Sequence, residues 1–209
     1  MDLYEYLINN FKKNEPILIS DIDIPNISAV NIRQQLKILT DKGKIKRFDK
    51  GIYFIPQETI FKSGSSLSPT KVIEKKYLRN NDLINGYLTG ITFANNLGIT
   101  TQVPMTIELV SNKATKDYRE TSLAQTTVII RKPKVTITDE NYKILQLLDL
   151  IKDIDTYAEI SDFELKNRIA NYMDKMKITF TMMEPFLALY PDKIYKNMYE
   201  TGVLKGVSA

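Results

Sequence analysis

The sequence predicts an α+β fold made of a small N-terminal domain and a larger mixed α/β domain with a helical C-terminal part. Three observations carry this prediction. Apolar residues at helical spacing precede a basic hairpin pattern within residues 1–57, and a small, polar stretch (KSGSS) follows at 62–66. Helical and β-type runs then mix from residue 68 onward, and 209 residues suffice for two cores. We therefore expect a first domain at 1–57, a linker at 58–67 and a second domain at 68–209.

The composition excludes several classes of functional site. The chain has no His and no Cys, which rules out the usual structural zinc sites, a Ser-His-Asp triad and cysteine nucleophiles. It also lacks the glycine-rich phosphate-binding motifs. A carboxylate-only metal site remains possible, but we interpret the two Asp-x-Asp pairs, at 21/23 and 153/155, as capping and turn residues. We expect no enzyme activity, no cofactor and no metal.

The N-terminus lacks the profile of a signal peptide, and no run of 18 apolar residues occurs. Absence of Cys fits a reducing compartment. These features predict a cytoplasmic protein without a membrane span.

The first domain reads as three helices. Leu3, Leu7 and Phe11 recur every four residues and predict a helix over roughly 2–13. Ser20 and Asp21 favour a brief second helix that ends at Pro25. A third helix, capped by Asn26 or Ser28, extends to Lys42, and Gly43 stands where a left-handed residue ends a helix. Its predicted buried stripe consists of Ala29, Ile32, Leu36 and Leu39.

The opposite face of the third helix is polar, with Asn31, Arg33, Gln34, Gln35 and Lys37. Amide side chains can pair with adenine and Arg with guanine, so this face suits the edges of DNA bases. An ordinary solvated helix face is the alternative.

Two short β-type runs, 44–48 and 52–55, follow the third helix and are joined by a turn that contains Gly51. Three helices and then a basic hairpin is the order of a winged helix-turn-helix, whose third helix enters the major groove. Residues 33–50 hold seven basic side chains against two acidic ones. The alternative is that the module binds protein. The candidate DNA contacts are Ser28, Asn31, Arg33, Gln34, Lys37, Lys44, Lys46, Arg47 and Lys50, and we expect Lys46 and Arg47 to face solvent.

The second domain mixes both types of element. Helices are predicted over 68–80 and 88–97, and strands over 105–110, 126–131 and 135–137. The stretch between 110 and 126 reads as irregular. Thr138 with Asp139, and Ser161 with Asp162, are predicted to cap two further helices, and a tail rich in Met and Tyr forms two short helices broken at Pro191.

Two stretches resemble a known family. The pattern Leu36, Leu39, Gly43, Ile45, Arg47, Gly51, Tyr53 and Pro56, and the run ITFANNLGITTQVP at 91–104, are similar to the AbiE-type abortive-infection antitoxins and their wider group of winged-helix transcriptional regulators. The two motifs span most of residues 28–110. The resemblance implies an antitoxin that represses its own operon by binding double-stranded promoter DNA. It also implies that the second domain counteracts a nucleotidyltransferase-like toxin in the type IV manner, without stable binding of the toxin.

A second hypothesis remains open. The protein could be a stand-alone transcriptional regulator whose second domain senses a small molecule or a protein partner. A nucleotidyltransferase-like reading frame immediately downstream of the gene would favour the antitoxin.

Overall fold

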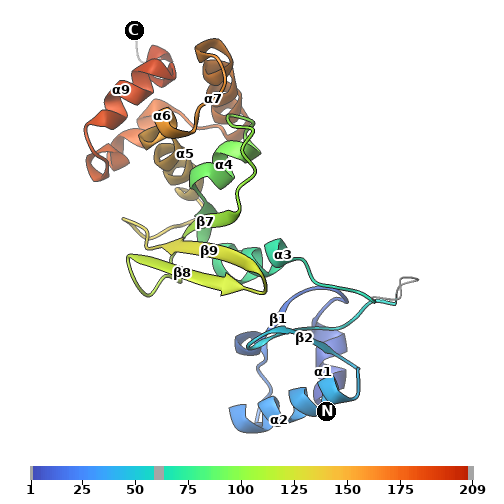
Figure 1. Ribbon diagram of the computed structural model, residues 1–209. Coiled ribbons are helices and arrows are strands. Elements are labelled where there is room, and N and C mark those ends of the chain that lie inside the picture. Colours follow the sequence, from blue (N-terminus) through green and yellow to red (C-terminus); the bar gives the residue numbers. More distant parts are fainter. Residues whose placement is uncertain (1, 59–63, 207–209) are drawn as a thin grey trace. The chain divides into compact units, whose positions relative to one another are not determined.

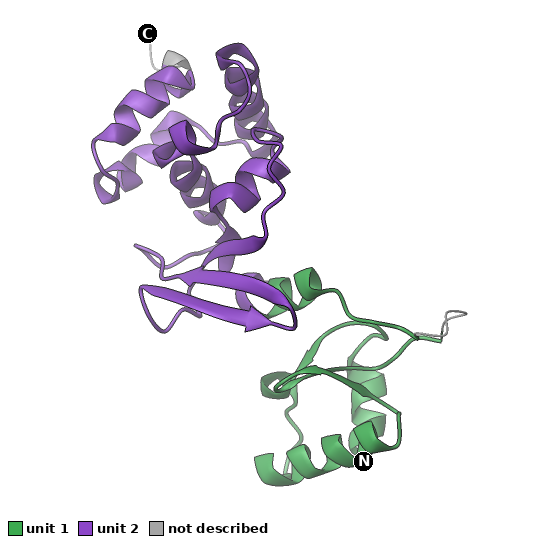
Figure 2. Cartoon of the chain, viewed as in Figure 1, with its two compact units in different colours: residues 1–76 green, residues 77–209 purple. Residues whose placement is uncertain are grey.

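The computed structural model describes residues 2–58 and 64–206 and has a mixed α+β fold (Figure 1), which confirms the predicted class. The chain divides into two compact units, residues 1–76 and residues 77–209 (Figure 2). No helix within the described ranges is long and apolar enough to cross a membrane.

The first unit combines two α-helices with a small antiparallel sheet. Strand β3 lies between β1 and β2 in this three-stranded sheet. Its elements are α1 (Leu3–Asn10), β1 (Ile17–Leu18), the 3-10 turn η1 (Ile19–Asp21), α2 (Ala29–Asp41), β2 (Lys46–Asp49), β3 (Ile52–Phe54) and α3 (Pro69–Ile73).

Helices α1 and α2 build the core of this unit together with the sheet. Leu3 and Leu7 of α1 and Ile32, Leu36 and Leu39 of α2 are buried in one cluster. Their spacing of three or four residues places them on one side of each helix, as the sequence predicts. Gly43 follows Lys42, the C-cap of α2, and has a φ of 69°, which confirms the left-handed residue predicted at this end of the helix.

Three details of the first unit differ from the prediction. The brief second helix is only the 3-10 turn η1, because Ile22 and Ile24 alternate with an exposed Asp23 and so favour extended backbone. Helix α1 ends at Asn10 rather than near residue 13. Ala29 is exposed, since it is the first residue of α2 and lies beyond the edge of the core.

The described part of the predicted linker packs on the first unit. Ser65 and Leu67 are buried, and the Ser65 hydroxyl accepts a hydrogen bond of 3.1 Å from the backbone N–H of Gln57. Helix α3 belongs to the same unit, where Lys71 pairs with Glu15 at 2.6 Å. The boundary of the units therefore falls after residue 76 rather than within 58–67, and residues 59–63 of the predicted linker lie outside the described residues.

The second unit carries a four-stranded sheet of order β6-β7-β9-β8, in which only the pairing of β7 with β9 is parallel. A π-helical turn (Glu74–Leu78) and a small ladder of β4 (Arg79–Asn80) with β5 (Leu83–Ile84) precede it. Its strands are β6 (Gly86–Leu88), β7 (Thr106–Ser111), β8 (Tyr118–Leu123) and β9 (Thr126–Arg131).

Helices gather on one side of this sheet, with α5 among them (Figure 1). They are α4 (Gly90–Asn96), α5 (Tyr142–Lys152), α6 (Ile154–Tyr157), α7 (Asp162–Met176), α8 (Phe180–Met183), the 3-10 helix η3 (Glu184–Leu189), α9 (Lys193–Glu200) and the 3-10 turn η4 (Val203–Gly206). Leu147 and Leu148 of α5 are fully buried in their core. Met183, Tyr190 and Met198 close the same core, so these residues of the Met- and Tyr-rich tail have a packing role.

Several predicted elements of the second unit are wrong in extent or type. The helix expected over 68–80 is helical from Pro69 through Leu78, but it changes from α-helix to π-helix after Ile73. Leu88 belongs to β6 rather than to the helix that follows. Residues 135–137 form no strand, whereas β8 lies in the stretch expected to be irregular. Strand β8 escaped prediction because it is a polar strand at the edge of the sheet, with most side chains exposed.

Helix starts were predicted with mixed success. Ser161 caps α7 as predicted, and it does so in a capping box with Glu164, which was not predicted from the sequence. Helix α5 instead begins at Tyr142, because the Asn141 side chain accepts the backbone N–H of Thr138 at 2.8 Å and holds residues 138–141 outside the helix.

Candidate nucleic-acid interface

The outer face of α2 is polar and exposed. Arg33, Gln34 and Lys37 are exposed while Ile32, Leu36 and Leu39 are buried, which confirms the predicted orientation of the helix. Two exposed apolar side chains, Val30 (62%) and Ile38 (50%), flank these polar residues and were not predicted as part of the site. Val30 lies three residues before Arg33 and Ile38 lies four residues after Gln34, and this helical spacing was the available signal in the sequence. Apolar side chains can contact the thymine methyl group, so the face offers both kinds of base contact.

Ser28 fixes the start of α2. Its hydroxyl accepts a hydrogen bond of 3.2 Å from the backbone N–H of Asn31, which confirms Ser28 rather than Asn26 as the N-cap. The Asn31 side-chain oxygen accepts a second bond, of 2.9 Å, from the amide of Gln35. Ser28 and Asn31 are therefore exposed residues that also order the first turns of the helix.

The hairpin of β2 and β3 carries further cations. Arg47 is exposed, and its Nε donates to the backbone oxygen of Asp49 at 3.3 Å. Lys50 is exposed in the turn, where Gly51 has a φ of 73°. Lys44, just before β2, has its ammonium 4.5 Å from the centre of the Tyr4 ring.

Lys46 does not face solvent as expected. It is half-buried, and its ammonium donates to the backbone oxygen of Ser65 at 3.3 Å. The sequence concealed this contact because Ser65 lies 19 residues away, in the stretch interpreted as a linker. Lys46 therefore holds the segment after β3 rather than offering a free cation.

The remaining cations of this surface are not neutralised by acidic side chains. Within residues 2–58 and 64–206, no salt bridge involves Arg33, Lys37 or Lys50. Lys42, at the C-terminal end of α2, is also exposed and was missing from the predicted contacts, although it belongs to the same basic run. Unpaired ammonium and guanidinium groups on adjacent elements are what binding of phosphates requires.

The second motif, residues 91–104, forms α4 and a constrained loop. The Glu159 carboxylate accepts hydrogen bonds from the Thr100 hydroxyl (2.8 Å), the Thr101 backbone N–H (2.7 Å) and the Gln102 side-chain amide (2.6 Å). These bonds lower the pKa of Glu159 to about 2, with the bond from Gln102 contributing most. Asn95 of α4 adds a bond of 2.9 Å to the backbone oxygen of Gln102.

The constrained loop presents two apolar side chains to solvent, Val103 at 83% and Met105 at 94% exposure. Both side chains are therefore accessible to another molecule. Among the described residues, no group of three or more His, Cys, Asp or Glu side chains could hold a metal ion.

Comparison with known proteins identifies the family of the chain. No curated protein matches the chain. The model of a family of unknown function, DUF6088, matches residues 4–180, which include most of the first unit and the second unit through α7. The chain therefore belongs to the DUF6088 family of unknown function.

Proposed function

We propose that the first unit is a winged helix-turn-helix that binds double-stranded DNA, and that the protein is a cytoplasmic transcriptional autorepressor and type IV antitoxin. The observation that carries the DNA-binding part is the unpaired cationic and amide face of α2, followed directly by an exposed basic hairpin. In this proposal α2 enters the major groove and the β2–β3 hairpin contacts the backbone.

The roles of the side chains follow from their chemistry. Gln34 and Arg33 on α2 suit base edges, because each can form two hydrogen bonds with one base. Lys37, Lys44, Arg47 and Lys50 suit phosphates, which supply affinity without sequence preference. Inverted repeats are the expected target if two copies of the protein bind.

The antitoxin part of the proposal is supported by the resemblance of residues 91–104 to the second motif of the AbiE-type antitoxins. The exposed apolar pair on the constrained loop adds a surface through which the second unit could act against a nucleotidyltransferase-like toxin. This part does not depend on DNA binding.

DNA binding is tested on a fragment of the protein's own promoter with the double variant Arg47→Glu, Lys50→Glu. Both side chains are exposed, so the fold should survive, while attraction to phosphate becomes repulsion. For about five phosphate contacts, the wild-type slope of log K against log salt should be about −4 to −5. The slope of the double variant should be less steep by about 2, because two phosphate contacts are lost. Fluorescence anisotropy at several salt concentrations measures both slopes.

The matched control is Lys12→Glu, Lys13→Glu, which makes the same change of charge at exposed positions after α1. This control should keep most of the promoter affinity. Equal losses in the two double variants, or an affinity that does not vary with salt, would contradict the proposed interface.

A further inference from the structure

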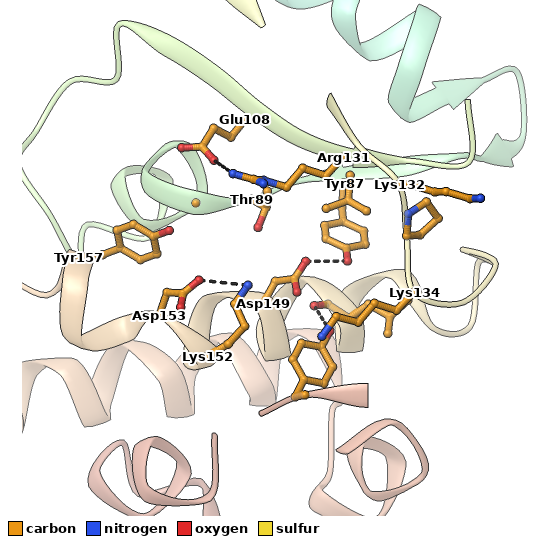
Figure 3. A pocket seen from close by; sticks show the side chains of 15 residues that line it. Tyr87, Thr89, Glu108, Arg131, Lys132, Lys134, Asp149, Lys152, Asp153 and Tyr157 are labelled. Carbon is orange, nitrogen blue, oxygen red and sulfur yellow. Dashed lines mark hydrogen bonds and ion pairs between the residues drawn. The ribbon is translucent and has the colours of Figure 1, made fainter. Parts of the chain in front are cut away.

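The second unit contains a cavity of about 340 Å³ that the sequence did not predict. It lies among β6, β7, the end of β9 and α5, with Tyr157 and Tyr190 from the helical part (Figure 3). Gly90 helps to keep this space open, because its φ is 60° and a Cβ atom there would lie 2.9 Å from the Glu108 carboxylate.

The carboxyl group of Asp149, a residue of α5, lines one wall of the cavity. The Tyr87 hydroxyl donates a hydrogen bond of 2.8 Å to Asp149 (Figure 3). Burial is the main cause that raises the pKa of Asp149, against the opposing effects of Tyr87 and of the neighbouring lysines. Burial and the nearby carboxyl group also raise the pKa of Tyr87 and of Tyr190. Asp149 is thus a fixed hydrogen-bonding group inside the cavity rather than a surface carboxylate.

Two of the four cations that line the cavity are already paired. Arg131 lies 3.8 Å from Glu108, and Lys152 lies 3.0 Å from Asp153. Asp153 also binds Lys193 at 2.8 Å, and the bonds from the two lysines lower its pKa although burial opposes them. The positive charges of Arg131 and Lys152 are therefore largely balanced by carboxylates of the protein and are not free to bind an anionic ligand.

The other two cations, Lys132 and Lys134, have no acidic partner among the described residues. The Lys134 ammonium instead donates to the backbone oxygen of Leu189 and lies 4.0 Å from the centre of the Tyr190 ring. Loss of solvent lowers the pKa of Lys134, and the attraction of Asp149 and Asp153, which form no salt bridge with it, opposes this only in part. An anionic group bound against the Lys134 ammonium would offset the rest of this loss of solvent.

We propose that this cavity binds a small phosphate monoester whose organic part carries hydroxyl groups, such as a sugar phosphate or a nucleoside monophosphate. The phosphate would contact Lys132 and Lys134, and a ligand hydroxyl would donate to Asp149. A volume near the lower end of the usual range for ligand sites, about 300–1,000 Å³, fits one small ligand rather than a dinucleotide. This proposal goes beyond DNA binding and does not rest on it.

The experiment is isothermal titration calorimetry on the full chain with four probes: AMP, ribose 5-phosphate, inorganic phosphate and adenosine. The proposal expects saturable binding of AMP or ribose 5-phosphate at about 1 mM or below, at least about tenfold tighter than inorganic phosphate or adenosine. Binding of AMP alone assigns a nucleotide, and equal binding of both esters assigns the sugar phosphate as the recognised part. Absence of binding by both esters, or equal binding of inorganic phosphate, overturns the proposal.

Variants then locate the bound ester. Lys132→Met with Lys134→Met should weaken its binding by about tenfold or more, because the phosphate loses both unpaired cations. The matched control, Lys113→Met with Lys116→Met, changes exposed lysines outside the cavity and should leave the affinity unchanged. Asp149→Asn should weaken the esters but not inorganic phosphate. If binding is the same in the Lys132/Lys134 variant and in its control, the ester binds elsewhere and the proposed site is wrong, whether or not Asp149→Asn folds.

Discussion

Glu159 shows how one exposed carboxylate can order a loop. Its carboxylate accepts hydrogen bonds from the backbone N–H of Thr101 and from the side chains of Thr100, Thr101 and Gln102. Three consecutive residues therefore bind a single carboxylate. Hydrogen bonds to the ionised form favour that form, which is why the pKa of Glu159 falls from its usual 4.5 to about 2. The conformation of the loop is thereby linked to the protonation of this group.

This linkage predicts a pH-dependent stability. Because the folded-state pKa of Glu159 lies below its unfolded value, its contribution is fully present above about pH 4.5 and is lost as the pH falls toward 2. Glu159→Gln should therefore lower the free energy of unfolding at pH 7, and the difference from wild type should shrink at pH 3. Urea unfolding of both proteins at the two pH values measures this. A difference that stays constant with pH would mean that the charge of Glu159 does not hold the loop.

Local spacing predicted single residues well only where the partner is close in sequence. Ser28 as a cap of α2 follows from its contact with Asn31, three residues away. The half-buried state of Lys46 depends on Ser65, and the environment of Asp149 depends on Tyr87, 62 residues away. Such pairings arise only when strands and helices distant in sequence assemble, so periodicity carries no signal of them.

Helix α2 links the fold of the first unit to its proposed interface. Its inner stripe is anchored by Leu36, which is 0% exposed, while its outer face carries Arg33 and Lys37. The position of the outer residues therefore depends on the packing of the inner ones. The buried and exposed faces of α2 could be predicted because apolar residues recur at the helical period of about 3.6 residues. The polar edge strand β8 is mostly exposed and carries no such pattern of apolar residues.

Leu36→Ala should destabilise the first unit by about 2–5 kcal/mol, because it removes a fully buried side chain and leaves a cavity in a small core. Val30→Ala, on the same helix but 62% exposed, is the matched control and should change stability by less than about 0.5 kcal/mol. Chemical denaturation followed by circular dichroism compares them. A loss of comparable size in both variants would show that α2 is not oriented with Leu36 inward.

The two units have separate hydrophobic cores, one built around α1 and α2 and the other around α5. The first unit holds the basic face of α2 and the β2–β3 hairpin, and the second holds the loop with Val103 and Met105 and the cavity near Asp149. Substitutions of exposed residues in one unit leave the core of the other untouched. The proposed activities should therefore be separable by mutation in the intact chain.

The double variant Val103→Asp, Met105→Asp should keep the promoter affinity of the wild type but lose protection of cells against the cognate toxin. Charge at two exposed positions spares the fold yet removes the apolar surface of the loop. Arg47→Glu with Lys50→Glu should behave oppositely, losing promoter binding but still protecting cells when expressed from a foreign promoter. Anisotropy and a co-expression growth assay measure the two activities. If the folded Arg47/Lys50 variant also fails to protect, the basic surface takes part in neutralisation and the proposed division of labour is wrong.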